Sequence, residues 1–295
     1  MKTIALFLAL SAASLAAPVK APRRACQTRD LNGTYAFLAD GSTLIPGAPL
    51  TGPFMRVGYF TANGKGAIHF WTLAIYNGIN FGEESFAGTY SVEADCTFDM
   101  IDAVPAPINS NVTFKGQIAL GGDQVTFMVL SIADPSIPPL TTVVGFGKIR
   151  GVDRCTTESL DGAWAMELHG TRNIPAPGTP GTPTAYRQVG QFQFDGKSGF
   201  LDNFLSSNNG VVTPDSGSGT YTVSPDCTFD LTYKLGTTDY AIRGSLIDPD
   251  NAFLGLNMPG PTVPNLGILT GAVATGSLTR QSSQPRIRRD ATEGE

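Results

Sequence analysis

Apolar and polar residues alternate along most of the chain, in short segments separated by Gly-, Pro- and Asn-rich stretches. Alternation with a period of two predicts strands that bury one face, and frequent Gly and Pro argue against long helices. In the first half of the chain the pattern predicts eight strands, at 34–39, 54–61, 67–76, 85–92, 97–102, 112–120, 125–132 and 142–149.

The second half of the chain repeats the first. The phrase "GTYSVEADCTFD" (88–99) returns as "GTYTVSPDCTFD" (219–230), and "VGYFTANGKG" (57–66) returns as "VGQFQFDGKS" (189–198). A period of about 130 residues is far longer than a solenoid repeat. We therefore predict two tandem copies of one all-β domain, at 26–151 and 155–281.

Four cysteines are divided equally between the two halves. Four cysteines allow three pairings. The duplication favours the pairing within each half, so we predict the disulfides Cys26–Cys96 and Cys155–Cys227. Each would fasten the start of a domain to the turn inside the repeated phrase.

Long and short connections alternate between the predicted strands. The segments "ANGKG", "EADC" and "GGDQ" are short, whereas "DGSTLIPGAPLTGP", "NGINFGEE", "AVPAPINSN" and "ADPSIPPLT" are long. In an up-and-down antiparallel sheet such alternation gathers every long loop at one end. Eight strands of this kind close into a barrel without exposed edges. We expect two such barrels, each with a mouth of long loops and a floor of tight turns.

The segments "LNGTYAF" (31–37) and "LDGAWAM" (160–166) resemble the G-x-W first strand of the calycins. The cup open at one end is likewise similar to lipocalin and allene-oxide-cyclase-like barrels. The resemblance implies a ligand-binding interior, as in ligand carriers and in cofactor-free cyclases such as some fungal pericyclases.

The two ends of the chain and its charge bear on where the protein is found and on which partners it can bind. Residues 1–24 resemble a secretory signal peptide with a short propeptide, 282–295 read as a disordered tail, and no later segment is apolar enough for a membrane anchor. With a net charge of −5, the chain offers no basic stripe for nucleic acid. We expect a secreted protein, with glycosylation sequons at Asn32 and Asn111.

The sequence lacks the motifs of serine hydrolases, P-loops, dinucleotide sites and zinc sites. We therefore predict neither a metal nor a cofactor. Strand parity places Arg56 and Asp102 inside the first barrel near its mouth, unless both turn into solvent. These two residues and His69 are the catalytic candidates. The predicted ligand-binding residues are Phe54, Phe60, Trp71, Tyr76, Phe98, Tyr186, Gln188, Tyr233 and Tyr240.

The strand that carries His69 and Trp71 is apolar on both faces, so its inward face is ambiguous. One face would line the first barrel while the other packs against the second.

Three functions fit these features. The first is binding of a hydrophobic small molecule with cofactor-free cyclisation or isomerisation, of the pericyclase type, in fungal-like secondary metabolism. The second is a non-enzymatic secreted carrier. The third is a cell-surface or host-interaction protein whose barrels are filled by side chains. The oligomeric state stays open.

Overall fold

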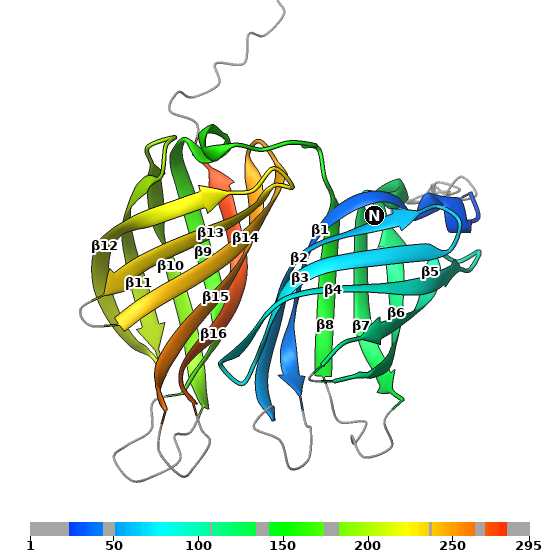
Figure 1. Cartoon of the computed structure of the whole chain (residues 1–295), viewed down its shortest axis with the longest axis horizontal. Coiled ribbons are helices and arrows are strands. Elements are labelled where there is room, and N and C mark those ends of the chain that lie inside the picture. The colour runs from blue at the N-terminus through cyan, green and yellow to red at the C-terminus, as the bar shows by residue number, and fades with distance from the viewer. Residues whose placement is uncertain are drawn as a thin grey trace, which may run out of the picture.

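A computed structural model describes residues 24–43, 51–106, 108–133, 142–173, 183–235, 238–262 and 269–281. The predicted leader (apart from Arg24) and the predicted tail lie outside the described residues. Two closed antiparallel barrels of eight strands each confirm the predicted fold class and the architectural resemblance to calycin-like barrels. Figure 1 shows the barrels side by side, with the first half of the chain in one and the second half in the other.

Neighbouring strands pair in chain order in both barrels, and the last strand of each closes onto the first. Barrel one contains β1 (Asn32–Thr43), β2 (Gly52–Asn63), β3 (Ala67–Tyr76), β4 (Ile79–Val92), β5 (Thr97–Val104), β6 (Ser110–Ala119), β7 (Gln124–Ile132) and β8 (Thr142–Ile149). Barrel two contains β9 (Gly162–Asn173), β10 (Pro183–Phe194), β11 (Gly199–Asn208), β12 (Val211–Val223), β13 (Thr228–Leu235), β14 (Thr238–Asp248), β15 (Asn251–Thr262) and β16 (Leu269–Arg280).

The connection expected to be long at "NGINFGEE" is in fact a two-residue turn, and so is its counterpart in barrel two. β3 joins β4 through Asn77 and Gly78, with φ of 50° and 81°, and β11 joins β12 through Asn209 and Gly210, with φ of 49° and 85°. Two successive positive φ values match the type I′ turn, which favours Asn-Gly because its twist suits a hairpin. The residues that follow each turn therefore continue as strand, and this change brings Glu84 into β4.

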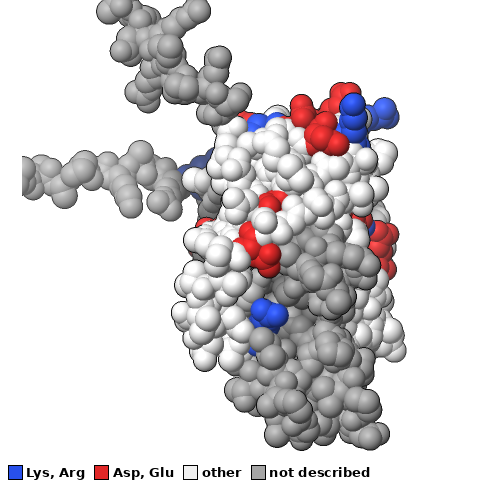
Figure 2. Space-filling model, turned by 90° about the vertical axis from the view of Figure 1, so that its left-hand side faces the viewer, with Lys and Arg blue, Asp and Glu red and all other residues white. Residues whose placement is uncertain are grey.

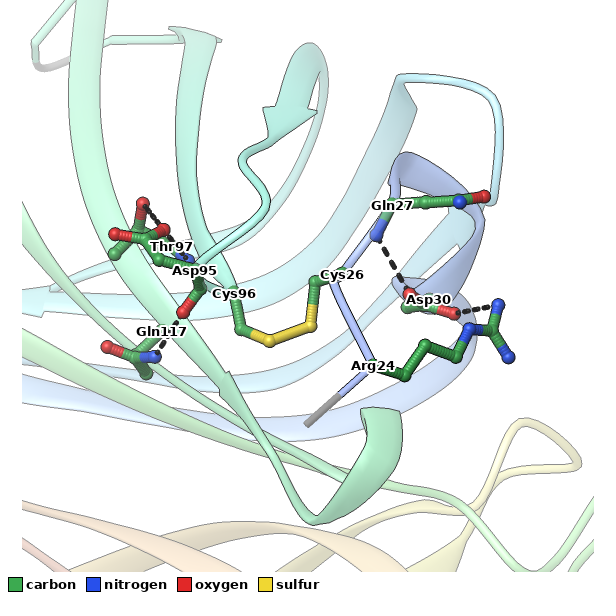
Figure 3. Close-up of a disulfide and its surroundings, with 8 residues drawn as sticks. All are labelled: Arg24, Cys26, Gln27, Asp30, Asp95, Cys96, Thr97 and Gln117. Carbon is green, nitrogen blue, oxygen red and sulfur yellow. Dashed lines mark hydrogen bonds and ion pairs between the residues drawn. A yellow bond between two sulfur atoms is a disulfide. The ribbon is translucent and has the colours of Figure 1, made fainter. Parts of the chain in front are cut away.

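The floor of each barrel is held by a disulfide, and both bridges have the predicted pairing. In Figure 3 the Cys26–Cys96 bridge joins the start of the described chain to the β4–β5 turn. Asp95 shapes that turn by accepting hydrogen bonds from the backbone N–H of Thr97, at 2.9 Å, and from its hydroxyl, at 2.6 Å. The repeated phrase is thus a strand, a fastened floor turn and a strand.

The calycin-like segment of barrel two closes the floor beneath the core. Trp164 is fully buried, and its indole N–H donates to the carbonyl of Leu160 at 2.7 Å. The guanidinium of Arg280 lies 4.5 Å from the ring centroid and donates to the carbonyls of Ser159 and Asp161. This cation–π contact and the hydrogen bonds together anchor β16, the last strand of barrel two, to the turn before β9, its first strand.

A third apolar cluster lies between the barrels, where β1 and β2 meet β14, β15 and β16. Met55, Val57 and Ile75 of barrel one pack there against Ile247 and Phe253 of barrel two. These strands consequently bury both faces, one toward their own barrel and one toward the other barrel. Leu73 and Ile75 of β3 belong to this cluster, which explains why β3 is apolar on both faces.

The side of the molecule formed by barrel two carries few charged side chains, as Figure 2 shows. Its outer strands β10, β11 and β12 expose aliphatic side chains among polar ones, namely Val189, Leu201, Leu205, Val211 and Val212. Among the described residues, no helix has the length and apolar character needed to cross a membrane.

Candidate functional site

A cavity of about 50 Å³ lies in the half of barrel one nearest the mouth. Its lining is mostly apolar and includes Phe37, Ala39, Phe54, Phe70, Tyr76, Phe86, Val104, Ile108, Val112, Phe114, Phe127, Val129, Ile132 and Val143. This space holds about three to five water molecules. Pockets for drug-sized ligands measure roughly 300–1,000 Å³. The cavity therefore admits a slender group rather than a bulky molecule.

Arg56 of β2 points into this apolar interior and is paired with a carboxylate from β4. Its Nη2 lies 2.5 Å from Oε2 of Glu84 and donates to the hydroxyl of Tyr76 at 3.1 Å. The guanidinium carbon also lies 5.6 Å from the ring centroid of Phe54 and 5.0 Å from that of Phe86. The sequence alternative in which Arg56 turns into solvent is wrong, because the side chain is buried.

Asp102 of β5 also lies inside barrel one, and it is only 1% exposed. Both carboxyl oxygens lack a hydrogen-bond partner within the described protein. The carboxyl lies against Gly88 of β4, where an added Cβ would come within 1.8 Å of Oδ1. Glycine at 88 is what allows the carboxyl to occupy this place. Buried carboxyl oxygens are nearly always hydrogen-bonded in proteins, so this carboxyl marks a place in the cavity where a polar group can bind.

Arg56, Tyr76, Glu84 and Asp102 form a polar layer inside barrel one, and burial controls the protonation of its acidic groups. Desolvation raises the pKa of Asp102 to about 7, although the nearby Arg56 acts to lower it. Desolvation likewise raises the pKa of Glu84, against the pull of Arg56, and raises that of Tyr76 to about 12. Near neutral pH, Asp102 is therefore present in both its protonated and its charged form. A group of this kind can give or take a proton.

The four predicted residues that meet at the cavity are Phe54, Arg56, Tyr76 and Asp102. Phe60, in contrast, lies deeper in the barrel, stacked on Tyr35 at 4.9 Å. Phe98 is buried near the floor and packs against Gly116. Neither Phe60 nor Phe98 lines the cavity.

His69 and Trp71 lie on the outer face of β3, contrary to their expected place in the pocket. Their rings stack at 4.0 Å, Trp71 stacks on Tyr59 at 5.0 Å, and His69 Nε2 is 2.7 Å from the hydroxyl of Ser85. The inward positions of β3 are instead occupied by residues such as Phe70 and Tyr76. The pattern could not choose between the faces because the second barrel buries part of the outer one.

Barrel two carries a different polar set. At the position that matches Arg56 it has Gln188, which is buried and accepts a hydrogen bond from the Tyr186 hydroxyl at 3.0 Å. Tyr233 and Tyr240 are register partners on β13 and β14, and their side chains lie outside the described part of the structure. Asp202, which sequence reasoning missed, is a second buried carboxyl, and desolvation raises its pKa.

The seam between the barrels contains larger hollows, of about 280 and 310 Å³. Several of their charged side chains are paired across the seam or within one barrel. Arg243 binds Asp230 at 2.7 Å and Glu83 at 2.6 Å. Asp40 accepts from Thr275 at 2.9 Å and lies 3.3 Å from His169, and the His169 hydrogen bond lowers the pKa of Asp40. These pairs join the two barrels, whereas the buried Asp102 carboxyl of barrel one has no partner in the described protein, so barrel one is the candidate site.

Sequence reasoning also missed Glu84, the partner of Arg56. The sequence pattern predicts a long loop at "NGINFGEE" and offers no reason to place either glutamate inside the barrel. The Asn-Gly pair at its start is the signal that could have placed Glu84, because Asn-Gly is the strongest short-range indication of a hairpin. Within the described residues, no group of three or more His, Cys, Asp or Glu side chains could hold a metal ion.

No family model and no curated protein matches the chain. Among solved structures, an S-type phycobiliprotein lyase from Guillardia theta is 14% identical over 45% of this chain and 96% of its own, with a TM-score of 0.30. Transferrin binding protein B from Neisseria meningitidis is 9% identical over 84% of this chain and 76% of its own, with a TM-score of 0.30. CghA, solved with Sch210972, is 8% identical over 86% and 90%, with a TM-score of 0.27. Scores this low carry no argument about the function of this chain.

Proposed function

We propose that this protein binds a slender, largely apolar small molecule in barrel one, with the polar end of the ligand against Asp102 and Arg56. The observation that carries the proposal is the buried Asp102 carboxyl, which has no partner in the described protein and lines an otherwise apolar cavity. Leaving such a group unsatisfied costs about 1–3 kcal/mol, and a ligand that satisfies it recovers this energy as affinity. The two disulfides favour an oxidising compartment, so we place this function in the secretory pathway or outside the cell.

Thermal unfolding with a series of six-carbon ligands tests this proposal. The ligands share one unbranched chain and differ in the end group: alcohol, aldehyde, carboxylate or amine. At least one should raise the melting temperature, because a ligand at one hundred times its Kd stabilises the folded state by about 2.7 kcal/mol.

Two matched substitutions locate the site. Val104→Phe narrows the cavity and should abolish the stabilisation, whereas Val189→Phe, on the exposed outer face of barrel two, should leave it intact. If no ligand in the series stabilises the protein, or if both variants respond as the wild type does, the proposal is wrong.

A second candidate function is cofactor-free isomerisation of a carbonyl compound. The pKa of Asp102, at about 7, favours this candidate because a general base is most effective when its pKa lies near the pH of the reaction. Asp102 would take a proton from the carbon beside the carbonyl and return it to another carbon. The donors on Arg56 and Tyr76 would stabilise the charge that develops on the oxygen. Conversion of a β,γ-unsaturated ketone to its conjugated isomer, followed by absorbance, tests this reaction. Asp102→Asn should abolish conversion and retain binding, whereas a carrier would show no conversion in either protein.

A further inference from the structure

The polar layer of barrel one has more unsatisfied acceptors than donors. Three carboxyl oxygens have no partner within the described protein: both oxygens of Asp102 and Oε1 of Glu84. Among the buried side chains of the described residues that face this interior, the unsatisfied donors are Nε of Arg56 and the hydroxyl of Thr72. Each carboxylate oxygen can accept more than one hydrogen bond. A ligand that complements this layer must therefore bring hydrogen-bond donors.

The charges in the polar layer also favour a ligand that carries hydrogen-bond donors. Arg56 and Glu84 neutralise each other across 2.5 Å, so ionised Asp102 leaves one negative charge without compensation. The other titratable side chains that point into barrel one from its described strands are tyrosines. Tyr76 is close to Arg56, and Tyr35 and Tyr90 lie at the floor, where their hydroxyls donate to backbone carbonyls. β6, β7 and β8 present no charged side chain to this interior. One cation would make the cavity electrically neutral.

The walls of the cavity also favour a cation. Phe54, Phe70, Phe86 and Tyr76 surround the layer, and two of these rings already lie within cation–π range of Arg56. The negative face of an aromatic ring attracts ammonium groups as well as guanidinium groups. The mouth above the layer is lined by aliphatic side chains, among them Val104, Ile108 and Val143.

We propose that the ligand of barrel one is a primary amine with a slender apolar tail, whose ammonium group binds the Asp102 carboxylate while the tail lies along the aliphatic mouth. This inference rests on the proposed function and specifies its ligand class. An ammonium group supplies three donors and one positive charge. A cavity of about 50 Å³ accommodates this head group, whereas a branched or polycyclic ligand would not fit.

The pH dependence of binding distinguishes an amine from a neutral ligand. Alkylamines stay protonated well above neutral pH, as lysine does, but they need the charged form of Asp102. The pKa of that carboxyl is about 7, so the charged fraction rises up to about 90-fold from pH 5 to pH 8. Affinity for an amine should therefore increase over this range. An alcohol or aldehyde that accepts a hydrogen bond from protonated Asp102 should show the opposite trend.

Isothermal titration of the full chain with n-hexylamine and with 1-hexanol, at pH 5, 6, 7 and 8, tests the inference. Hexylamine should bind at least tenfold more tightly at pH 8 than at pH 5, and more tightly than hexanol at pH 8. Asp102→Asn should remove this binding. Asp202→Asn, which changes the buried carboxyl of barrel two, should leave it unchanged. Circular dichroism of both variants verifies that they fold.

Three results overturn the inference, and they differ in what they leave standing. If hexanol binds in barrel one while hexylamine binds weakly or without dependence on pH, the ligand class is wrong and the binding function stands. If neither the amine nor any neutral six-carbon ligand binds to the folded protein, the proposed function itself fails. Binding of hexylamine that survives in Asp102→Asn places the amine elsewhere and contradicts the assigned site.

Discussion

The buried carboxyl of Asp102 makes a specific prediction about stability. Asp102→Asn keeps the shape of the side chain and removes its charge. In the unfolded chain the aspartate titrates at its ordinary value of 3.8, whereas burial raises the pKa in the folded protein to about 7. Below pH 3.8 the group is protonated in both states and its charge costs nothing. As the pH rises from there toward 7, the folded state retains a proton that the unfolded state releases, so stability falls.

The size of this loss follows from the two pKa values. Each unit of difference corresponds to about 1.4 kcal/mol. The rise of the Asp102 pKa from 3.8 to about 7 therefore lowers the free energy of unfolding of the wild type by about 4 kcal/mol at and above pH 8. The Asn variant does not carry this cost. We expect the two proteins to be about equally stable at pH 4, and the variant to be more stable by about 4 kcal/mol at pH 8.

Urea-induced unfolding of both proteins at pH 4, 5, 6, 7 and 8 measures this difference. Glu84 and the other carboxyl groups also titrate, but they are present in both proteins and largely cancel in the comparison. Asp99→Asn is the control, because Asp99 lies on the outer face of the same strand and is half exposed beside Lys115. That variant should follow the wild type at every pH. A constant difference between Asp102→Asn and the wild type across the pH range would mean that burial does not raise the pKa of Asp102.

Three further changes test other parts of the structure. Arg56→Met leaves Glu84 buried without its partner and should lower the free energy of unfolding by about 3–5 kcal/mol. Changing both residues to apolar ones should lower it much less, and denaturant unfolding of the two variants measures the difference. Replacing Cys155 and Cys227 together by serine opens a loop with a sequence separation of 72 residues and should cost about 4 kcal/mol; a loss below about 1 kcal/mol in calorimetry would contradict this. Gly88→Ala places a methyl group against the Asp102 carboxyl and should weaken hexylamine binding about tenfold in titration calorimetry; unchanged affinity would show that the carboxyl can move without consequence.

The repeat and the alternating pattern were enough to predict two eight-stranded barrels, and the reason is physical. A barrel strand must place every second side chain in a closed interior, so the pattern survives in the sequence of each strand. The duplication then removed the ambiguity of the cysteine pairing. Arg56 and Asp102 were placed inside by the same parity, because each shares a face with phenylalanines that fill the barrel.

The parts that failed depend on contacts that one strand does not encode. The sequence pattern predicts a loop around Glu84 because Gly82 and two adjacent glutamates hide the alternation, although this segment belongs to β4. The pattern leaves the inward face of the strand with His69 and Trp71 ambiguous, because Leu73 and Ile75, on the face of these two residues, are apolar like the residues on the opposite face. Leu73 and Ile75 in fact pack in the seam against barrel two. Which outer faces are buried depends on how two barrels dock, and this does not follow from the pattern of one barrel.

A crystal structure of the wild-type protein with n-hexylamine at pH 8 would show whether the amine binds to Asp102. The distance to measure is the one between the amine nitrogen and the nearest carboxyl oxygen of Asp102. We expect about 2.7–3.0 Å, the length of a charge-assisted hydrogen bond, with the tail directed toward Val104 at the mouth of barrel one. A barrel one filled by its own side chains, or an amine bound only in the seam between the barrels, would contradict it.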